Sequence, residues 1–325
     1  MKRSALKFDW IKNSKSVLPK GEWFVEFFTP GELHAHKTVK VIRSSKTFFQ
    51  RATLIKTHTF GKMLVIDRET QSSEFDEAFY HESLAVPALL MHRKPQNALI
   101  LGGGEGATAR EILNAGTVKS VVMADIDYAV LDFAKNHMPE WHKGAFRDPR
   151  LTLLVQDAAE YVCRSKRKFD IIYSDLPCPI KGGPAFKLYT LEFFRKLRTM
   201  LNPGGIFIVQ AGPGTPLQFD LHPAIRNTLG KVFEFTRSYS AYIPSYDMPW
   251  TYLYCTDSPG ALPERFTAAG LDAVIKKRLR TKLRFSDGAT VLGAFILPRY
   301  YRDLIAASKD VITAGRPMYF TTSQH

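Results

Sequence analysis

The sequence predicts an α/β fold, in which a mainly parallel sheet is covered by helices on both faces and preceded by a small antiparallel β domain. Three observations lead to this prediction. Segments rich in β-branched and aromatic residues follow one another over residues 1–75 with no helical pattern between them. Strand-like and helix-like segments then alternate over residues 76–325. Where that alternation begins, a short apolar strand ends in a turn that holds four glycines between residues 102 and 106.

The first domain, residues 1–75, is expected to consist of short strands. Pro30–Gly31 and Phe60–Gly61 are the turn signals between them. His34 and His36 are a pair that could bind a metal ion, but no third ligand is near, so we expect them to be exposed hairpin residues. The expected strands are Trp23–Phe28, Thr38–Ile42, Thr47–Thr57 and Lys62–Ile66.

The second domain, residues 76–325, begins with an acidic and aromatic cluster that leads into a helix ending near Met91. Amphipathic segments predict further helices at Tyr128–His137 and Thr190–Leu201. Five strands of the parallel sheet are expected at Ala98–Leu101, Val118–Ala124, Leu151–Val155, Asp170–Ser174 and Gly205–Gln210. An antiparallel finish to the same sheet is expected at Val232–Arg237, Trp250–Thr256 and Ala294–Leu297.

Size and composition limit the classes of protein. With 325 residues, 45% of them hydrophobic, the chain can bury a proper core. No apolar run approaches the ~20 residues that a membrane span needs, and the basic segment Met1–Lys15 lacks the apolar stretch of a secretory signal. Three scattered cysteines do not suggest a disulfide framework or a zinc site. We therefore expect a cytoplasmic protein.

The net charge of +14 is the unusual bulk property, because it suggests nucleic acid or an anionic surface as a partner. The basic residues gather in clusters such as Arg164–Lys168 and Lys276–Arg284. No aromatic platform or nucleic-acid signature accompanies them. Solvated helix faces are therefore the expected explanation, and nucleic-acid binding is the less favoured alternative.

The glycine turn predicts a ligand site. A strand that breaks on glycines into a helix brings backbone N–H groups and a helix N-terminus close to a ligand. Gly102 and Gly104 are small enough for that close approach. Glu105 is the odd residue, since its carboxylate would repel a phosphate and attract a cation. The turn therefore favours a ligand that carries positive charge.

Acidic residues follow the other strands, at the edge where a doubly wound sheet binds ligands. Asp125 and Asp127 are placed to accept the hydroxyls of a ribose, and Asp157–Ala158 to contact an adenine. Helix capping is an alternative role for Asp127 and Asp157. It fits Asp175 poorly, because prolines follow that residue. The glycines and the first acids alone are compatible with both a nicotinamide-dependent and an S-adenosylmethionine-type enzyme.

The chain resembles the polyamine aminopropyltransferases, the spermidine synthase group, over almost all of its length beyond about residue 48. Gly182–Pro184 and Gln210–Pro213 look most like the thermospermine synthase branch, and His137–His142 looks like the thermophilic bacterial members. The motifs that carry the resemblance are Phe60–Asp67, Tyr80–Glu82, Gly102–Gly106, Asp125–Asp127, Gln156–Ala158, Asp175 with Leu188–Thr190, and Ile243–Tyr246.

This resemblance implies a Rossmann-like sheet of the S-adenosylmethionine-methyltransferase type as the catalytic domain. It implies an aminopropyl donor, decarboxylated S-adenosylmethionine, with no metal or further cofactor, and a homodimer or homotetramer. Asp175 would take the proton from the attacking amine. The residues implied for donor binding are Gln50, Gly102, Gly104, Glu105, Asp125, Ile126, Asp157 and Ala158, and those for acceptor binding are Tyr80, His81, Cys178, Gln210 and Tyr246.

One position departs from the family pattern. The family usually has Asp-x-x-Asp-Pro after the fourth strand, and its second acid grips the acceptor amine. Here Cys178 stands at that position. A neutral thiol cannot attract an ammonium group in the same way, so other acids are expected to bind the acceptor, or the chain is a paralogue with altered activity. The candidates are Glu74, Asp76, Glu82 and Asp247.

Three functions are therefore compared. The first is aminopropyl transfer to a di- or polyamine, with putrescine as the first expectation and spermidine or agmatine as alternatives. The second is methyl transfer to a small molecule from S-adenosylmethionine, which Glu105 disfavours because that donor carries its own carboxylate. The third is a basic binding protein without catalytic activity.

Overall fold

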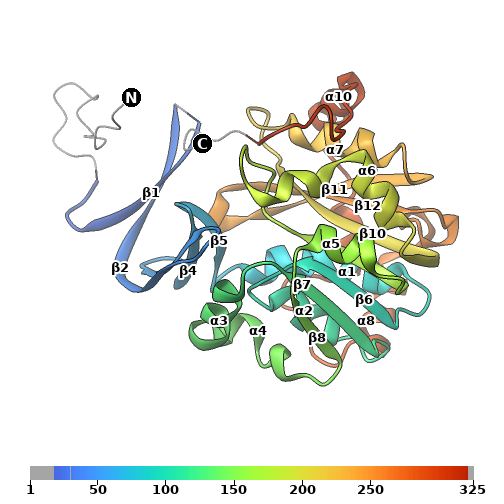
Figure 1. Ribbon diagram of the computed structural model, residues 1–325, viewed down its shortest axis with the longest axis horizontal. Coiled ribbons are helices and arrows are strands. Elements are labelled where there is room, and N and C mark those ends of the chain that lie inside the picture. Colours follow the sequence, from blue (N-terminus) through green and yellow to red (C-terminus); the bar gives the residue numbers. More distant parts are fainter. Residues whose placement is uncertain (1–17, 30, 321–325) are drawn as a thin grey trace.

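The computed structural model describes residues 18–29 and 31–320, which fold into two sheets (Figure 1). Met1–Lys15 and Pro30 lie outside the described residues. The first sheet is antiparallel, with its strands in sequence order. It is built from β1 (Glu22–Thr29), β2 (Glu32–Lys46), β3 (Arg51–Thr57), β4 (Lys62–Ile66) and β5 (Glu69–Ser73).

The second sheet is mixed and has the order β11-β12-β10-β9-β6-β7-β8. Its strands β6 to β10 are parallel to one another, and β11 and β12 add an antiparallel edge. This is the predicted Rossmann-like arrangement. The strands are β6 (Asn97–Gly102), β7 (Ser120–Asp125), β8 (Leu151–Val155), β9 (Phe169–Asp175), β10 (Leu201–Pro213), β11 (Phe235–Ile243) and β12 (Met248–Thr256).

Helices cover both faces of this sheet. Their bounds are α1 (Glu77–Met91), α2 (Ala107–Leu113), α3 (Tyr128–His137), α4 (Pro139–His142), α5 (Ala158–Arg164), α6 (Leu191–Arg198), α7 (Leu221–Leu229), α8 (Ala268–Arg278), α9 (Gly288–Gly293) and α10 (Arg299–Ala307). Short 3-10 turns lie at Ala145–Arg147, Pro184–Tyr189, Pro244–Tyr246, Pro259–Ala261 and Pro263–Arg265. In the described residues, none of the helices has the length and apolar character to cross a membrane.

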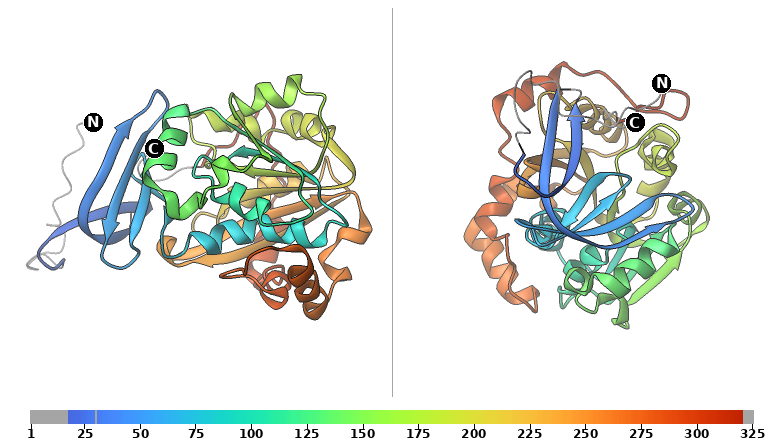
Figure 2. Two further views of the ribbon diagram at one scale, coloured as in Figure 1. Left: turned by 90° about the horizontal axis from the view of Figure 1, so that it is seen from below. Right: turned by 90° about the vertical axis from the view of Figure 1, so that its left-hand side faces the viewer.

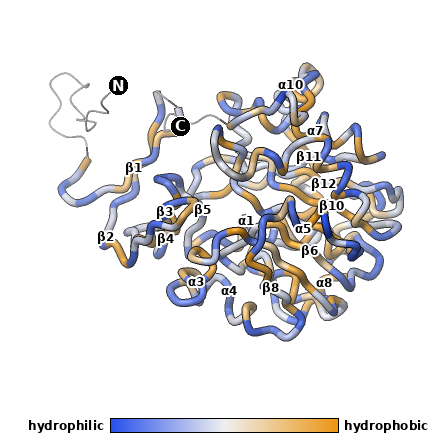
Figure 3. The backbone as a smooth tube through the Cα atoms, viewed as in Figure 1, coloured by the Kyte–Doolittle hydropathy of each residue, from blue (hydrophilic) through white to orange (hydrophobic). Residues whose placement is uncertain are grey.

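Alternation along the strands divides the core into two layers. Ile100 packs in one layer with α1, α2, α8 and α9, whereas its neighbour Leu101 packs in the other with α5, α6 and α7. Both side chains are fully buried, as expected for central parallel strands. The same strands form the continuous hydrophobic interior in Figure 3.

The N-terminal sheet packs at one end of the second sheet (Figure 2). Leu54 of β3 and Leu64 of β4 bury against Phe133 of α3 and Trp141 of α4. Asp127 adds a polar link, since its Oδ2 accepts hydrogen bonds from the Thr47 hydroxyl at 2.6 Å and the Gln50 amide at 3.2 Å. This docking closes one side of the strand-end edge where the site is expected.

Some predicted elements are wrong in their bounds or type. Residues 294–297 form no strand, because Ala294 caps α9 and its carbonyl accepts the Ser240 N–H. The third strand begins at Arg51 because the Thr47 hydroxyl holds a turn, accepting the Gln50 N–H at 3.0 Å. Strand β11 begins only at Phe235, and β5 has no counterpart among the predicted strands. The hydrophilic sequence of β5, Glu-Thr-Gln-Ser-Ser, carries no strand signal.

Two further expectations are wrong in part. His34 and His36 lie in the β1–β2 hairpin as half-buried residues that pack against the rings of Phe28 and Phe60, and they are not exposed. The Lys276–Arg284 cluster is only partly a solvated face, because α8 ends at Arg278. The Arg278 guanidinium donates to the carbonyls that follow α1, including that of His92 at 2.9 Å.

The glycine turn fastens β6 to β9 at their carboxyl ends. Gly103 N donates to the Asp175 carbonyl at 3.1 Å. Gly102 has a φ of +80°, and a Cβ there would lie 2.4 Å from that carbonyl oxygen. Only glycine fits this position, since a side chain would clash with backbone and strain the left-handed conformation. The turn therefore fixes where Asp175 emerges from β9.

The Gly102→Ala variant should lose at least about 2 kcal/mol of unfolding free energy, from left-handed strain and the clash with Asp175. Chemical denaturation measures this loss. Gly293→Ala is the matched control, because nothing lies within 4 Å of a Cβ added to that glycine of α9. The control should be neutral or slightly stabilising. Equal stability of both variants and the wild type would contradict the close approach.

Candidate active site

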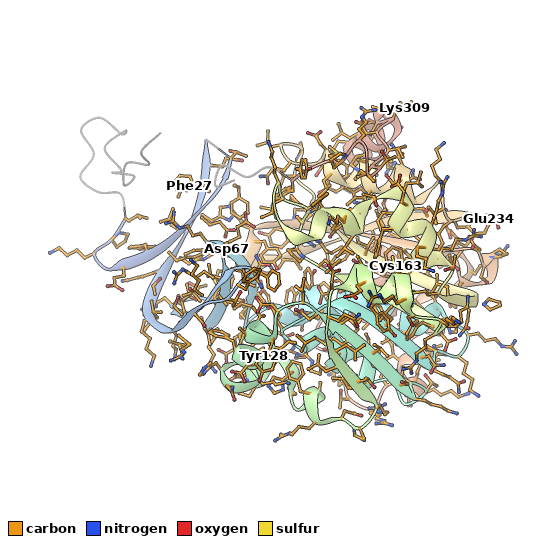
Figure 4. The ribbon with its side chains drawn as sticks, in the orientation of Figure 1. Phe27, Asp67, Tyr128, Cys163, Glu234 and Lys309 are labelled. Carbon is orange, nitrogen blue, oxygen red and sulfur yellow. The ribbon has the colours of Figure 1, made fainter. Side chains whose placement is uncertain are left out.

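A cavity of about 270 Å³ lies at the carboxyl edge of the parallel strands, where the N-terminal sheet closes over it. Phe27 and Asp67, labelled in Figure 4, line it from the N-terminal sheet. Every residue that the family resemblance implies for catalysis, donor binding or acceptor binding lines this cavity. These are Gln50, Tyr80, His81, Gly102, Gly104, Glu105, Asp125, Ile126, Asp157, Ala158, Asp175, Cys178, Gln210 and Tyr246.

Asp175 is held by two hydroxyl groups. Its Oδ1 accepts a hydrogen bond from Tyr80 at 2.9 Å, and its Oδ2 accepts one from Thr108 at 2.6 Å. Burial, together with the neighbouring Asp175 charge, raises the pKa of Tyr80 well above its ordinary value, so this hydroxyl remains a donor. Each oxygen keeps further acceptor capacity. The carboxylate is thus oriented and able to accept a proton from a bound group.

Asp125 and Asp127 have different positions. Asp127 caps α3, with its Oδ1 accepting from Ala129 N at 3.0 Å, and is almost fully buried. Asp125 lines the cavity, and its Oδ1 accepts from Asp127 N at 2.9 Å. Burial raises the pKa of Asp125 to about 6. Helix capping, the alternative role, is therefore confirmed for Asp127. The backbone N–H of Asp127 also orients the carboxylate of Asp125.

Asp157 caps a helix and also lines the cavity. Its Oδ1 caps α5 by accepting from Ala159 N at 2.7 Å. The residue also lines the cavity, beside Ala158. A capping carboxylate uses only part of its acceptor capacity. Capping and contact with a ligand are therefore compatible here.

Glu105 lies next to a series of ionisable groups that begins with His81. His81 Nδ1 lies 2.6 Å from the Glu77 carbonyl oxygen, so this nitrogen carries a proton, and Nε2 faces Glu105 Oε2 at 3.5 Å. Arg110 and Arg284 pair with the Glu77 carboxylate. Burial raises the pKa of Glu105 to about 7, whereas His81 opposes that rise. Glu105 Oε2 is buried with no hydrogen-bond partner in the described part of the chain.

Gln210 and Tyr246 are held by protein groups. Gln210 Nε2 donates to the Leu176 carbonyl at 2.6 Å and the Tyr189 hydroxyl at 3.0 Å, and its Oε1 accepts from Trp250 at 3.1 Å. The Tyr246 hydroxyl donates to the Gln71 carbonyl. Both residues therefore shape the cavity wall while their polar side-chain atoms are hydrogen-bonded to other protein groups.

Cys178 adds a neutral group to the same wall. Its Sγ lies 3.7 Å from Gln210 Nε2 and 3.9 Å from Oε1. Burial raises the pKa of the thiol to about 12, so it carries no charge at neutral pH. Compared with the acid of the family pattern, Cys178 therefore removes one negative charge from this part of the cavity wall.

The four acids suggested as substitutes do not line the cavity. Asp76 binds Ser245 N and Ser73, and Glu82 accepts from backbone N–H groups at residues 284–286. Glu74 accepts from Lys62 N, and the exposed Asp247 accepts from Tyr242. That expectation is wrong, because these carboxylates hold local structure.

Sequence reasoning missed several residues of the cavity wall or its support. Glu26 and Glu69 line the cavity from the N-terminal sheet, and Trp250 lines it from β12. Thr108 orients Asp175 from the first turn of α2. Thr108 could have been found, since it follows the glycine turn by two residues, at a helix start that faces the ligand. Glu26 and Glu69 depend on tertiary docking and have no local signal.

Known families and proteins match almost the whole chain. Residues 77–262 match the spermine/spermidine synthase domain, and residues 22–74 match the spermidine synthase tetramerisation domain. A polyamine aminopropyltransferase of Aeropyrum pernix is 39% identical over 311 residues, which is 94% of this chain and 98% of that protein. One from Synechococcus sp. strain JA-2-3B'a(2-13) is 38% identical over 302 residues, covering 91% and 96%.

Solved structures give the same result. A spermidine synthase in complex with the transition-state analogue AdoDATO has a TM-score of 0.82 and 25% identity, covering 91% of this chain and 99% of that one. The spermidine synthase from Thermotoga maritima has the same fold, with a TM-score of 0.80 at 24% identity, covering 93% and 100%.

The Glu105→Gln variant should raise the melting temperature at pH 8 and change it much less at pH 5. The pKa of Glu105 rises from 4.5 to about 7 on folding, so its stabilising contribution, complete below the unfolded value, is lost as pH rises through the folded value. Removing the buried charge should return up to about 3 kcal/mol at pH 8. Differential scanning fluorimetry at both pH values measures this.

The exposed Glu22 is the control site, and Glu22→Gln should shift the two melting temperatures equally. If Glu105→Gln were no more stable than the wild type at pH 8, Glu105 would not be a buried, uncompensated acid.

Proposed function

This chain belongs to the spermine/spermidine synthase family, whose enzymes are polyamine aminopropyltransferases, and we propose that it transfers the aminopropyl group of decarboxylated S-adenosylmethionine to a di- or polyamine. Methylthioadenosine is the second product. Putrescine is the first acceptor to test, with spermidine and agmatine as alternatives. The observation that carries the proposal is the pair of acids, Glu105 and Asp175, on one cavity wall beside the glycine turn.

The donor carries an ammonium group and a sulfonium and lacks a carboxylate. Glu105 is the proposed contact for its ammonium, because Oε2 is buried without a hydrogen-bond partner in the described residues. Asp125 and Asp157 are the proposed contacts for the nucleoside, with Ala158 and Ile126 beside the base. Gly102 and Gly104 allow the backbone to approach, and Gln50 supports Asp125 through Asp127.

The reaction forms one bond and breaks another. The acceptor nitrogen attacks the carbon next to the sulfonium, a C–N bond forms, and the C–S electron pair moves to sulfur, which becomes neutral. A primary amine has a pKa near the ~10.4 of lysine, so it arrives protonated. Asp175 is the proposed base that takes this proton, held in place by Tyr80 and Thr108. Alignment of nitrogen, carbon and sulfur supplies the rest.

Two other functions are not favoured. Intact S-adenosylmethionine has a carboxylate, which would meet the buried Glu105 and cost free energy. Binding of nucleic acid has no support beyond the net charge. The cytoplasmic location and the absence of a cofactor remain predictions. We also propose a homo-oligomer, supported by the match of residues 22–74 to the tetramerisation domain.

The test is a screen of putrescine, spermidine and agmatine with decarboxylated S-adenosylmethionine, read by the mass of the product. Addition of one aminopropyl group to at least one amine, with release of methylthioadenosine, is the expected outcome. A thermal-shift comparison should favour the decarboxylated donor over S-adenosylmethionine. The proposal is abandoned if no amine reacts and neither methylthioadenosine nor the donor binds.

Asp175→Asn should lower kcat by about 10²–10⁴-fold, because an amide cannot accept the proton of the ammonium. Donor affinity, measured by calorimetry, should change little, since the amide preserves the shape of the site. Asp132→Asn, an exposed position on α3, is the control and should retain activity. Near-normal turnover by Asp175→Asn would remove Asp175 from its role as base.

A further inference from the structure

Glu26 and Glu69 bring negative charge to the cavity from the N-terminal sheet. Glu26 is 5% exposed, and Thr70 binds both of its oxygens, through its N–H at 3.0 Å and its hydroxyl at 2.6 Å. Burial raises the pKa of Glu26 to about 7, and the charge of Glu69 adds to this rise. The groups that act on Glu26 include no lysine, arginine or histidine among the described residues. A cation from a ligand would balance the charge of Glu26.

Glu69 also acts on Cys178. Its charge raises the pKa of that thiol further, after burial. Both residues line the same cavity, so Glu69 lies within electrostatic range of the position where the family pattern has an acid. Negative charge is therefore present near position 178, although it is supplied by β5 and not by the loop after β9.

Aromatic rings line the cavity near Asp175 and these acids. The ring centroids of Tyr80 and Tyr246 are 6.5 Å apart, and those of Tyr246 and Trp250 are 5.1 Å apart. The charges of both Asp175 and Glu26 act on Tyr246, so this ring is in range of the two acids. An aromatic wall suits methylene groups, and its ring faces attract ammonium groups. The arrangement matches a chain of methylenes with a cation at each end.

We infer that Glu69, supported by Glu26, binds the distal cation of the acceptor amine and does the work of the acid that is absent at Cys178. This inference rests on the proposed function and adds which residues recognise the end of the acceptor that does not react. It assigns recognition of that end to the N-terminal sheet, whereas the reacting end belongs to Asp175. Amines with one charge should then be poor acceptors.

The experiment compares the best acceptor of the wild type, among putrescine, agmatine and spermidine, with 1-aminobutane, which has no distal cation. The measured quantity is the ratio of the two kcat/KM values. Glu69→Gln should lower this ratio about 10- to 100-fold, because a charge-assisted hydrogen bond is lost. The change should be mainly in the KM of the polyamine, while kcat/KM for 1-aminobutane and the KM of the donor stay unchanged.

Glu74→Gln is the matched control, since Glu74 follows the same strand but does not line the cavity. Its ratio should equal that of the wild type. An unchanged ratio in Glu69→Gln would overturn the inference. Equal losses with the polyamine and with 1-aminobutane would overturn it too, because they would show a purely structural role.

A second variant tests the exchange between the two positions. Cys178→Asp should improve the use of a short diamine, and in the Glu69→Gln background it should recover part of the lost ratio. No recovery, or loss of activity with both amines, contradicts the exchange. The two proposals fail differently: if the wild type modifies no amine, the proposed function fails, whereas an active wild type with an unaltered ratio in Glu69→Gln refutes only this inference.

Discussion

Uncompensated negative charge is the constraint that governs this site. Glu26, Glu105, Asp125 and Asp175 face one cavity, and burial raises the pKa of the first three. The protein surrounds these acids with hydroxyl and backbone donors, and most of its cations lie elsewhere. A cavity of this kind is costly when empty and becomes favourable when cationic ligands enter. The proposed binding of an amine and of a sulfonium donor would relieve that imbalance.

The fold holds these acids in place with hydrogen bonds and with ion pairs to neighbouring residues. Asp175 is fixed by the glycine turn on its backbone and by Tyr80 and Thr108 on its side chain. The Glu77 carboxylate, 2% exposed, is neutralised by Arg110 and Arg284, and its carbonyl orients His81 towards Glu105. The guanidinium groups of Arg110 and Arg284 thus lie behind the residues that line the cavity. They stabilise the wall and leave the substrate site free.

Sequence reasoning could locate the part of the site that is local. Gly102, Glu105, Asp125 and Asp175 lie at strand ends, and a doubly wound sheet brings strand ends to one edge whatever the details of packing. Glu26 and Glu69 could not be found in this way, because they reach the cavity only after the N-terminal sheet docks on α3 and α4. The same limit explains β5, whose polar strand is defined by pairing with β4.

Contacts made by the end of α8 and the segment that follows it limit where the chain of this enzyme can be truncated. The matched synthase domain ends at residue 262, yet Arg284 pairs with Glu77, residues 284–286 supply the N–H donors of Glu82, and Arg278 binds the carbonyls after α1. A chain truncated at the domain boundary would leave two buried carboxylates of α1 short of partners. The matched synthase domain is therefore smaller than the folding unit that holds α1, and with it Tyr80 and His81, in place at the cavity.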